Sequence, residues 1–245
     1  MSEIIFDKYE TKGAYHWREV AGPFWRRNAY TMGRYQLVLD ALAGLDQPWV
    51  LDVGCGDGAL AALIAARTEA PVYGLDTSRL ATAHAHAEFV KRHLVGVFQT
   101  IDQGNSYGAA SLFDVVVCAD VLEHTNWPAR MHAEMWRVLK PGGLLIITTP
   151  VRYTEKPLDR LHVREWYADE FKQFWHTNAR EGVEITQTLS HPIALTELYA
   201  SDHWLVGRVS RLFINLLACC GWNPFTRCKA FRSYSTQMIV ARKPL

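Results

Sequence analysis

The stretch VLDVGCGDG, residues 50–58, constrains this chain more than any other. Its first half follows Trp49 and is apolar and β-branched, which predicts a buried strand. Three glycines then alternate with other residues, and an alanine-rich, helix-forming segment follows over residues 59–66. Glycine lets the backbone turn tightly and approach a ligand, and a helix N-terminus offers unpaired N–H groups. The stretch therefore predicts the first strand, turn and helix of a nucleotide-binding α/β unit.

Two ligands stay open for this turn when only the glycines are considered. With the alanine after them, they also satisfy the G-x-G-x-x-G/A pattern of dinucleotide-binding proteins. A ribose needs an acid about 20 residues further on in either case, and Asp76 ends the next apolar run. The carboxylates of Asp52 and Asp57 would repel a pyrophosphate at close range, but they suit a ligand with an ammonium and a sulfonium. The charges therefore favour S-adenosylmethionine over NAD.

Three further motifs follow VLDVGCGDG in order: GLDTS (74–78), FDVVVCADVLEH (113–124) and RVLKPGGLLIITTP (137–150). Together the four motifs resemble the class I S-adenosylmethionine-dependent methyltransferases, nearest to the branch that includes the ubiquinone-biosynthesis O-methyltransferases. The resemblance covers residues 50–150. It implies S-adenosylmethionine as cofactor, S-adenosylhomocysteine as product and a Rossmann-like sheet of seven strands with the last one antiparallel. It implies little about the acceptor, because one scaffold serves many substrates in this superfamily.

Composition and charge narrow the class of protein. A chain of 245 residues is expected to form a single domain, residues 1–245. A formal net charge of +1 gives no nucleic-acid footprint. The five cysteines lack metal-binding spacing and indicate reduced thiols in the cytoplasm. The N-terminus lacks a signal-peptide pattern and no apolar run is long enough to cross a membrane, so we expect no transmembrane segment. Monomer and homodimer both stay open.

Alternating strand and helix patterns predict an α/β fold with a mostly parallel, doubly wound sheet. We expect a cap segment over residues 1–32, a cofactor-binding half over 33–150 and a substrate-side half over 151–245. Trp17, Trp25 and Tyr30 of the cap either line a pocket or pack on the sheet. The expected strands are 49–53, 72–75, 95–101, 114–118, 144–149, 183–188 and 235–242. The expected helices are 33–44, 59–66, 128–140, 165–175 and one that runs from a cap at Thr77 or Ser78 to about residue 93.

About 45 residues separate the sixth and seventh expected strands, too many for a simple connection. We therefore expect a helical insertion at about residues 190–232. Within it, apolar residues recur at helical spacing from Leu205 to Cys220, and Arg208, Arg211 and Asn215 fall opposite them. This pattern predicts an amphipathic helix whose apolar face packs on the body of the domain. A lid over the substrate and a surface that meets a lipid-like substrate are the alternatives.

The motifs nominate eight cofactor-binding residues. Gly54 and Gly56 are expected to let the backbone pass close to the methionine moiety, and Asp52 to bind its amino group or nearby backbone N–H groups. A carboxylate accepts two ribose hydroxyls at once, which makes Asp76 the expected ribose ligand. The resemblance implies Arg34 at the methionine carboxylate, Thr77 beside Asp76, Asp102 at the adenine amino group and Ala119 as a backbone contact. Arg34 also fits an exposed helix position, and Asp102 a plain turn.

Asp120, Glu123 and His124 follow the fourth strand as D-V-L-E-H. In the relatives this resemblance points to, the matching Glu, Glu and His can hold magnesium near a catechol-like oxygen. Asp120 shortens that reach, and relatives without a metal share V-L-E-H, so we expect no metal. His124 is a candidate general base because imidazole titrates near neutrality, or it binds backbone groups. His162 follows the fifth strand, at the ligand-binding edge of the sheet, as a second base or a surface residue.

The prediction is an S-adenosylmethionine-dependent methyltransferase that acts on a small molecule or a glycan, by direct in-line transfer to oxygen. Such an enzyme has mainly to align its acceptor with the methyl group, with His124, His162 and Asp120 as candidate catalytic residues. The alternatives are an NAD-dependent oxidoreductase, an N- or C-methyltransferase of a small metabolite, and a binding module without transfer activity.

Overall fold

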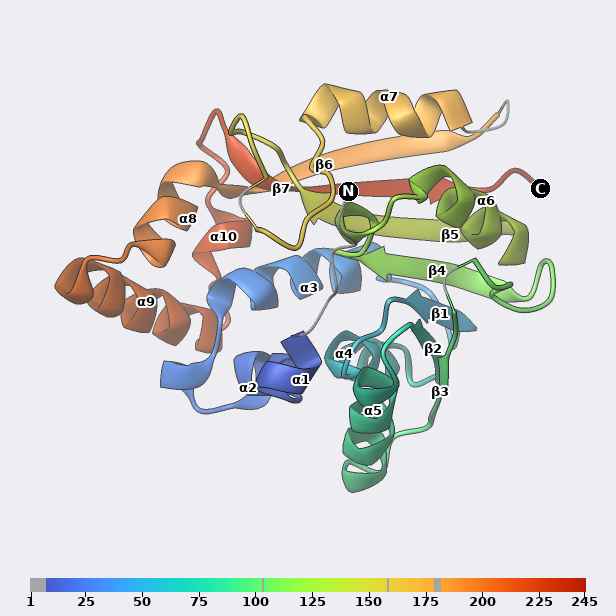
Figure 1. Ribbon diagram of the computed structural model, residues 1–245, viewed down its shortest axis with the longest axis horizontal. Coiled ribbons are helices and arrows are strands. Elements are labelled where there is room, and N and C mark those ends of the chain that lie inside the picture. Colours follow the sequence, from blue (N-terminus) through green and yellow to red (C-terminus); the bar gives the residue numbers. More distant parts are fainter. Residues whose placement is uncertain (1–7, 103, 158, 179–181) are drawn as a thin grey trace.

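A seven-stranded sheet with helices on both faces forms the body of the protein (Figure 1). The structure, a computed structural model, describes residues 8–102, 104–157, 159–178 and 182–245, so the expected cap segment begins outside the described residues. The strand order is β3-β2-β1-β4-β5-β7-β6, and β7 runs antiparallel to its neighbours. This confirms the predicted Rossmann-like sheet. The strands are β1 (Val50–Val53), β2 (Val72–Asp76), β3 (Gly96–Thr100), β4 (Phe113–Ala119), β5 (Leu139–Pro150), β6 (Glu184–Pro192) and β7 (Tyr234–Arg242).

Alternate residues of the central strands feed two separate cores, one on each face of the sheet. Val115 and Val117 of β4 pack with α3, α4 and α5, whereas Val116 packs with α6 and α7. Figure 1 shows these two helix layers on opposite sides of the sheet.

The α-helices are α1 (Lys8–Lys12), α2 (Tyr15–Ala21), α3 (Ala29–Ala41), α4 (Ala59–Thr68), α5 (Arg79–Lys91), α6 (Pro128–Val138), α7 (Ala168–Asn178), α8 (Ile193–Ala200), α9 (Trp204–Cys219) and α10 (Pro224–Arg227), and η1 (Phe24–Arg26) and η2 (Leu122–His124) are 3-10 turns.

Several helix ends differ from the sequence prediction for local reasons. Helix α3 begins four residues early because Asn28 caps it, its side chain accepting hydrogen bonds from two backbone N–H groups of the first turn. Helix α6 ends before residue 140 because Leu139 already pairs with Phe113 in the sheet. Helix α7 begins at Ala168 instead of residue 165, since the backbone of Trp166 bonds to Arg152. Ser78 caps α5, as predicted.

Helices α8, α9 and α10 lie between β6 and β7, at one end of the molecule (Figure 1). Helix α9 is the predicted amphipathic helix, but its predicted orientation is wrong. Its polar Asn215 is buried beside Ile214, whereas Val209 and Phe213 are 57% and 60% exposed. Most of its apolar face therefore points to solvent instead of the domain body. None of the described helices is long and apolar enough to cross a membrane.

Candidate functional site

A cavity of about 1370 Å³ opens at the carboxyl ends of the parallel strands, where open α/β sheets bind ligands. Residues from the glycine turn, from the ends of β1, β2 and β4, from the loop after β5 and from α1 and α3 line its wall. All eleven residues that the sequence nominates for cofactor binding or catalysis lie on this wall: Arg34, Asp52, Gly54, Gly56, Asp76, Thr77, Asp102, Ala119, Asp120, His124 and His162.

The glycine turn needs residues without a Cβ at its floor. Gly54 has φ +76°, and a Cβ there would lie 2.3 Å from Cγ2 of Val121. Gly56 has φ +54°, and its Cβ would lie 2.1 Å from the hydroxyl of Tyr9. Left-handed backbone favours glycine, and a Cβ at either position would force the neighbouring side chain to move. The turn thus brings bare backbone to the cavity, as its sequence predicts.

Two carboxylates flank the turn, that of Asp52 buried and that of Asp76 partly buried. Asp52 is 1% exposed at the end of β1, and its Oδ2 has no hydrogen-bond partner among the described residues. Burial, with a contribution from the charge of Asp76, raises the pKa of Asp52 to about 7. The Oδ2 of Asp76 accepts a hydrogen bond from Gly56 N at 2.8 Å, and its Oδ1 accepts one from Ser78 N at 2.8 Å. Burial raises the pKa of Asp76, although these backbone donors oppose the shift.

Asp57, the other acid of the turn, has a structural position. It is fully buried and does not lie on the cavity wall. Its Oδ2 accepts a hydrogen bond from His16 N, and its carbonyl oxygen accepts one from the indole of Trp17. Of the two acids expected to repel a pyrophosphate at close range, Asp52 lies on the cavity wall and Asp57 lies behind it. The carboxylate instead holds α2 against the start of α4.

Arg34 of α3 and Asp120 form an ion pair on the cavity wall, with Nη1 and Oδ2 2.8 Å apart. Burial alone would lower the pKa of Arg34, but Asp120, with smaller contributions from Tyr30, Tyr35 and Glu123, raises it above its usual value. Nε of Arg34 and Oδ1 of Asp120 have no hydrogen-bond partner within the described ranges. The pair therefore keeps one donor and one acceptor for further contacts. It also occupies Asp120, the first member of the D-V-L-E-H motif.

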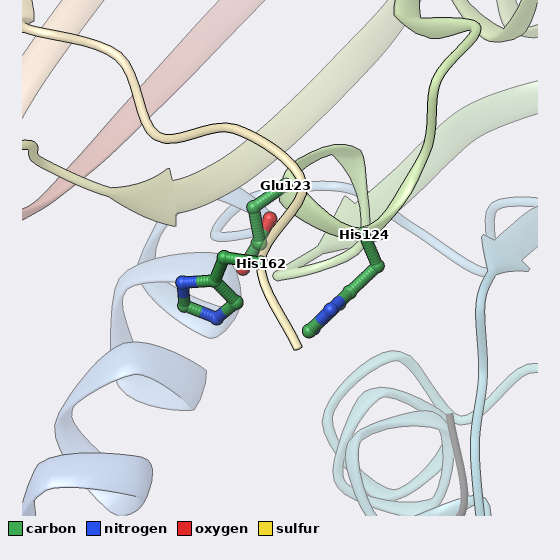
Figure 2. A group of neighbouring side chains, drawn as sticks. All are labelled: Glu123, His124 and His162. Carbon is green, nitrogen blue, oxygen red and sulfur yellow. The ribbon is translucent and has the colours of Figure 1, made fainter. Parts of the chain in front are cut away.

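Glu123 and His124 lie on η2 and point toward His162 of the loop after β5 (Figure 2). One ligand atom from each of the three lies within 4.8 Å of those of the other two. Burial, and then the charge of Asp120, raises the pKa of Glu123 well above its usual value. Burial lowers the pKa of His124 to about 4. His124 Nδ1 lies 2.8 Å from the carbonyl oxygen of Leu161, so this nitrogen donates and Nε2 is the acceptor.

His162 is paired with a carboxylate that the sequence reading missed. Its Nδ1 lies 2.5 Å from Oε1 of Glu165, which is only 3% exposed, and both residues line the cavity. A carboxylate on Nδ1 orients the imidazole and leaves Nε2 as its proton acceptor. In the sequence, the only indication of this pair is that Glu165 follows His162 by three residues.

The cap segment contributes residues that its irregular sequence did not single out. Tyr9 and His16 of α1 and α2 lie on the cavity wall. Of the three aromatic residues considered from sequence, Tyr30 lines the cavity, Trp17 is buried in the core on the α3–α5 side, and Trp25 is 60% exposed. The segment thus closes one side of the cavity, next to the glycine turn.

These residues fit S-adenosylmethionine. An unpartnered buried carboxylate oxygen at Asp52 suits an ammonium group, and Arg34 retains a donor for a carboxylate. Asp76 keeps lone pairs beyond its two backbone bonds, since an ionised carboxylate offers about four acceptor sites. Buried acids at the ends of both β1 and β2 suit a cationic ligand better than a pyrophosphate.

Comparison with known proteins is consistent with this geometry. A family model described as a methyltransferase domain matches residues 51–147. A probable S-adenosylmethionine-dependent methyltransferase of Mycolicibacterium smegmatis is 36% identical over 175 residues, 68% of this chain and 63% of the relative. A ubiquinone biosynthesis O-methyltransferase of Sodalis glossinidius is 35% identical over 56% of this chain and 55% of its own. The chain thus spans less than two thirds of the length of these two relatives. A ubiquinone biosynthesis O-methyltransferase of Yersinia pestis is 33% identical over 80% of this chain and 84% of the relative.

Solved structures share the fold at lower identity. Phosphoethanolamine N-methyltransferase 2 of Haemonchus contortus, in complex with S-adenosylmethionine, aligns with a TM-score of 0.65 and 17% identity over 97% of this chain and 58% of its own. The [4+2]-cyclase SpnF aligns with a TM-score of 0.62 and 23% identity over 88% of this chain and 83% of its own. At such identities the likeness concerns the fold alone.

Proposed function

Because this chain belongs to the S-adenosylmethionine-dependent methyltransferases, we propose that it transfers a methyl group to an oxygen of a small-molecule or glycan acceptor. When bound, S-adenosylmethionine supplies a methyl group on a sulfonium that is already activated for displacement. The protein then has to align the acceptor with that methyl group and, for a hydroxyl acceptor, to remove a proton.

The cofactor-binding side of the proposal rests on the turn and its acids. Asp52 would hold the ammonium group, and the raised pKa of its carboxyl would fall when a cation lies beside it. Asp76, fixed by two backbone N–H groups, would hold the ribose hydroxyls, with Thr77 beside it. Gly54 and Gly56 would leave room for the methionine moiety, and Arg34 would meet its carboxylate. Asp102 and Ala119 would border the adenosine, as the family resemblance implies.

The single observation that carries the acceptor chemistry is the 2.5 Å contact between His162 Nδ1 and Glu165. It gives the cavity a proton acceptor at Nε2 with its tautomer fixed, on the wall that also holds Asp52 and Asp76. A hydroxyl acceptor has to lose a proton during transfer, whereas the lone pair of a free amine already attacks. The pair therefore favours oxygen over nitrogen as the attacked atom.

His124 and Asp120 have supporting roles in this proposal. The pKa of about 4 leaves His124 neutral but weakly basic near pH 7. Its hydrogen bond to Leu161 holds the loop that carries His162, so His124 positions the base. Asp120 fixes Arg34. The reaction is proposed for the cytoplasm, where the five cysteines, all free in the structure, stay reduced.

Metal-assisted transfer is the second candidate, because Glu123, His124 and His162 bring one carboxylate and two imidazoles together (Figure 2). Such a set suits a first-row divalent cation. We place it second because the raised pKa of Glu123 favours its protonated form, which binds a cation poorly.

Calorimetric titration with S-adenosylhomocysteine, with NAD as the parallel ligand, tests the cofactor. Binding of S-adenosylhomocysteine alone supports the proposal, and binding of NAD alone replaces it with an oxidoreductase. The acceptor is then sought by incubating the protein with S-adenosylmethionine and a panel of catechols, phenols, simple glycosides and primary amines. A methyl mass gain on hydroxyl compounds is expected, and a gain confined to amines would contradict transfer to oxygen.

A further inference from the structure

Helix α9 buries its polar residue Asn215 and exposes most of its apolar face. Asn215 is 1% exposed, and its amide donates to the carbonyl oxygen of Arg27 at 2.6 Å. Its Oδ1 accepts hydrogen bonds from Ala29 N at 3.0 Å and from the hydroxyl of Tyr199 at 2.7 Å. Three polar groups thus bond to this one side chain, and Ala29 N also donates to the hydroxyl of Tyr199 at 3.0 Å. These bonds fix which face of α9 meets the domain.

The opposite face of α9 forms a continuous apolar stripe in solvent. Leu205, Val209, Phe213 and Leu216 follow one another at helical spacing and are 50%, 57%, 60% and 46% exposed. The turn η1 packs against α9 and adds Trp25, itself 60% exposed. We call these five residues the outer face. Contiguous exposed apolar surface of this kind marks a site of interaction.

The two elements that carry the outer face hold only basic charges. Helix α9 contains Arg208 and Arg211, η1 contains Arg26, and neither element contains an Asp or Glu. Arg208 is exposed on α9 between Leu205 and Val209, and Arg26 lies beside Trp25 on η1. The acids nearest in sequence, Asp202 and Glu197, precede the helix and do not interrupt the stripe.

These features select one kind of partner. A second copy docked face to face would bring the same arginines against each other without carboxylates to neutralise them. An anionic lipid surface complements both parts of the pattern, because it accepts apolar side chains at its acyl boundary and arginines at its headgroups. Tryptophan, here Trp25, also prefers such an interface.

We propose that α9 and η1 dock the protein on anionic membrane surfaces, with α9 lying in the plane of the interface and its outer face inserted among the lipids. The helix does not cross the bilayer, since no described helix is long and apolar enough to do so. The inference is independent of the reaction in the cavity, because it rests on the outer face and its charges alone.

Co-sedimentation with vesicles tests the docking. The probes are vesicles of phosphatidylcholine alone and of phosphatidylcholine with phosphatidylglycerol. We expect the protein to sediment with the second kind and to stay largely in solution with the first. Phe213→Ser with Leu216→Ser should weaken partitioning about tenfold or more, and Arg208→Glu should weaken it at low salt more than at high salt.

The matched control replaces exposed valines at the other end of the sheet. Val90→Ser with Val95→Ser removes side chains that are 74% and 70% exposed near β3 and should leave partitioning unchanged. Thermal unfolding checks that all variants fold alike. The proposal is overturned if the protein ignores phosphatidylglycerol vesicles or if both double variants bind equally well. It is also overturned if sedimentation velocity shows a dimer that only Phe213→Ser with Leu216→Ser dissociates, while vesicle binding is absent.

Discussion

The guanidinium of Arg34 lies 2.8 Å from the carboxylate of Asp120, joining α3 to the end of β4 at the cavity wall. Asp120 holds its carboxylate there in left-handed backbone, with φ +56°. Arg34 and Asp120, both predicted as site residues, therefore form an ion pair with each other. The pair occupies one oxygen of Asp120, the first acid of the D-V-L-E-H motif.

Breaking this pair should destabilise the protein. Asp120→Asn leaves the Arg34 charge in a partly buried place without its counter-ion, which costs on the order of 2 kcal/mol, between the costs for exposed and buried pairs. Urea unfolding measures the loss. Replacing both residues with leucine should recover part of it, as a double-mutant cycle would reveal. Lys140→Gln, which removes an exposed pair with Asp114, is the control and should cost less than about 1 kcal/mol. An Asp120→Asn variant as stable as the wild type would show that the pair contributes nothing.

Asp76→Asn should abolish most of the affinity for S-adenosylhomocysteine. Losing charge-assisted hydrogen bonds to two ribose hydroxyls costs roughly 3 kcal/mol, or about 100-fold in Kd. Calorimetric titration measures the change, and Asp46→Asn, an exposed acid away from the cavity, is the control. Circular dichroism checks that the glycine turn still folds without the full charge that accepts from Gly56 and Ser78. Unchanged affinity would remove Asp76 from the cofactor site.

Glu165→Gln should slow methyl transfer about 100-fold, within the usual range for loss of acid–base assistance, and leave cofactor affinity intact. The amide no longer fixes the imidazole of His162 through a charged acceptor. The rate with an identified acceptor and calorimetric titration with S-adenosylhomocysteine measure the two effects. His162→Gln should behave alike, and His176→Gln, an exposed histidine on α7, should not. Full activity of the Glu165→Gln variant would show that the His162–Glu165 pair has only a structural role.

Stability of the ligand-free protein should depend on the ionisation of Asp52. Its pKa rises from 3.8 to about 7 on folding. The folded state therefore binds the proton more tightly, so this stabilising contribution is complete below pH 4 and disappears as pH rises through 7. Over this pH range, the ionisation of Asp52 changes the free energy of unfolding by at most about 4 kcal/mol. The Asp52→Asn variant has no carboxyl that titrates at this position. The difference in unfolding free energy between the variant and the wild type should therefore change between pH 5 and pH 8. A constant difference would contradict the shift.

Chelation should leave methyl transfer unchanged. Burial and Asp120 raise the pKa of Glu123, which disfavours the carboxylate form that a metal site with His124 and His162 would need. Activity after dialysis against EDTA measures this directly. Loss of activity that magnesium or another divalent cation restores would make metal-assisted transfer the leading mechanism.

Local sequence determined the cofactor half of the protein. Strand, glycine turn and helix are encoded within residues 50–66, and the acids at the ends of β1 and β2 have fixed spacing from the turn. Consecutive βα units lie side by side in a parallel sheet, so residues at successive strand ends reach the same edge. This is why the nominated residues at and after the strand ends line one cavity, which Arg34 reaches from α3.

Only the tertiary structure decided which partner each polar side chain takes. The pairs Arg34–Asp120 and His162–Glu165 and the burial of Asp57 depend on segments that fold against each other. Helix α9 gives the sharpest contrast, because its periodicity predicted an amphipathic helix but not which face is buried. The amide of Asn215 bonds to the backbone groups of Arg27 and Ala29, and these bonds place the polar residue on the buried face of the helix. Periodicity in sequence gives the faces of a helix, whereas the unsatisfied groups of its neighbours decide which face turns inward.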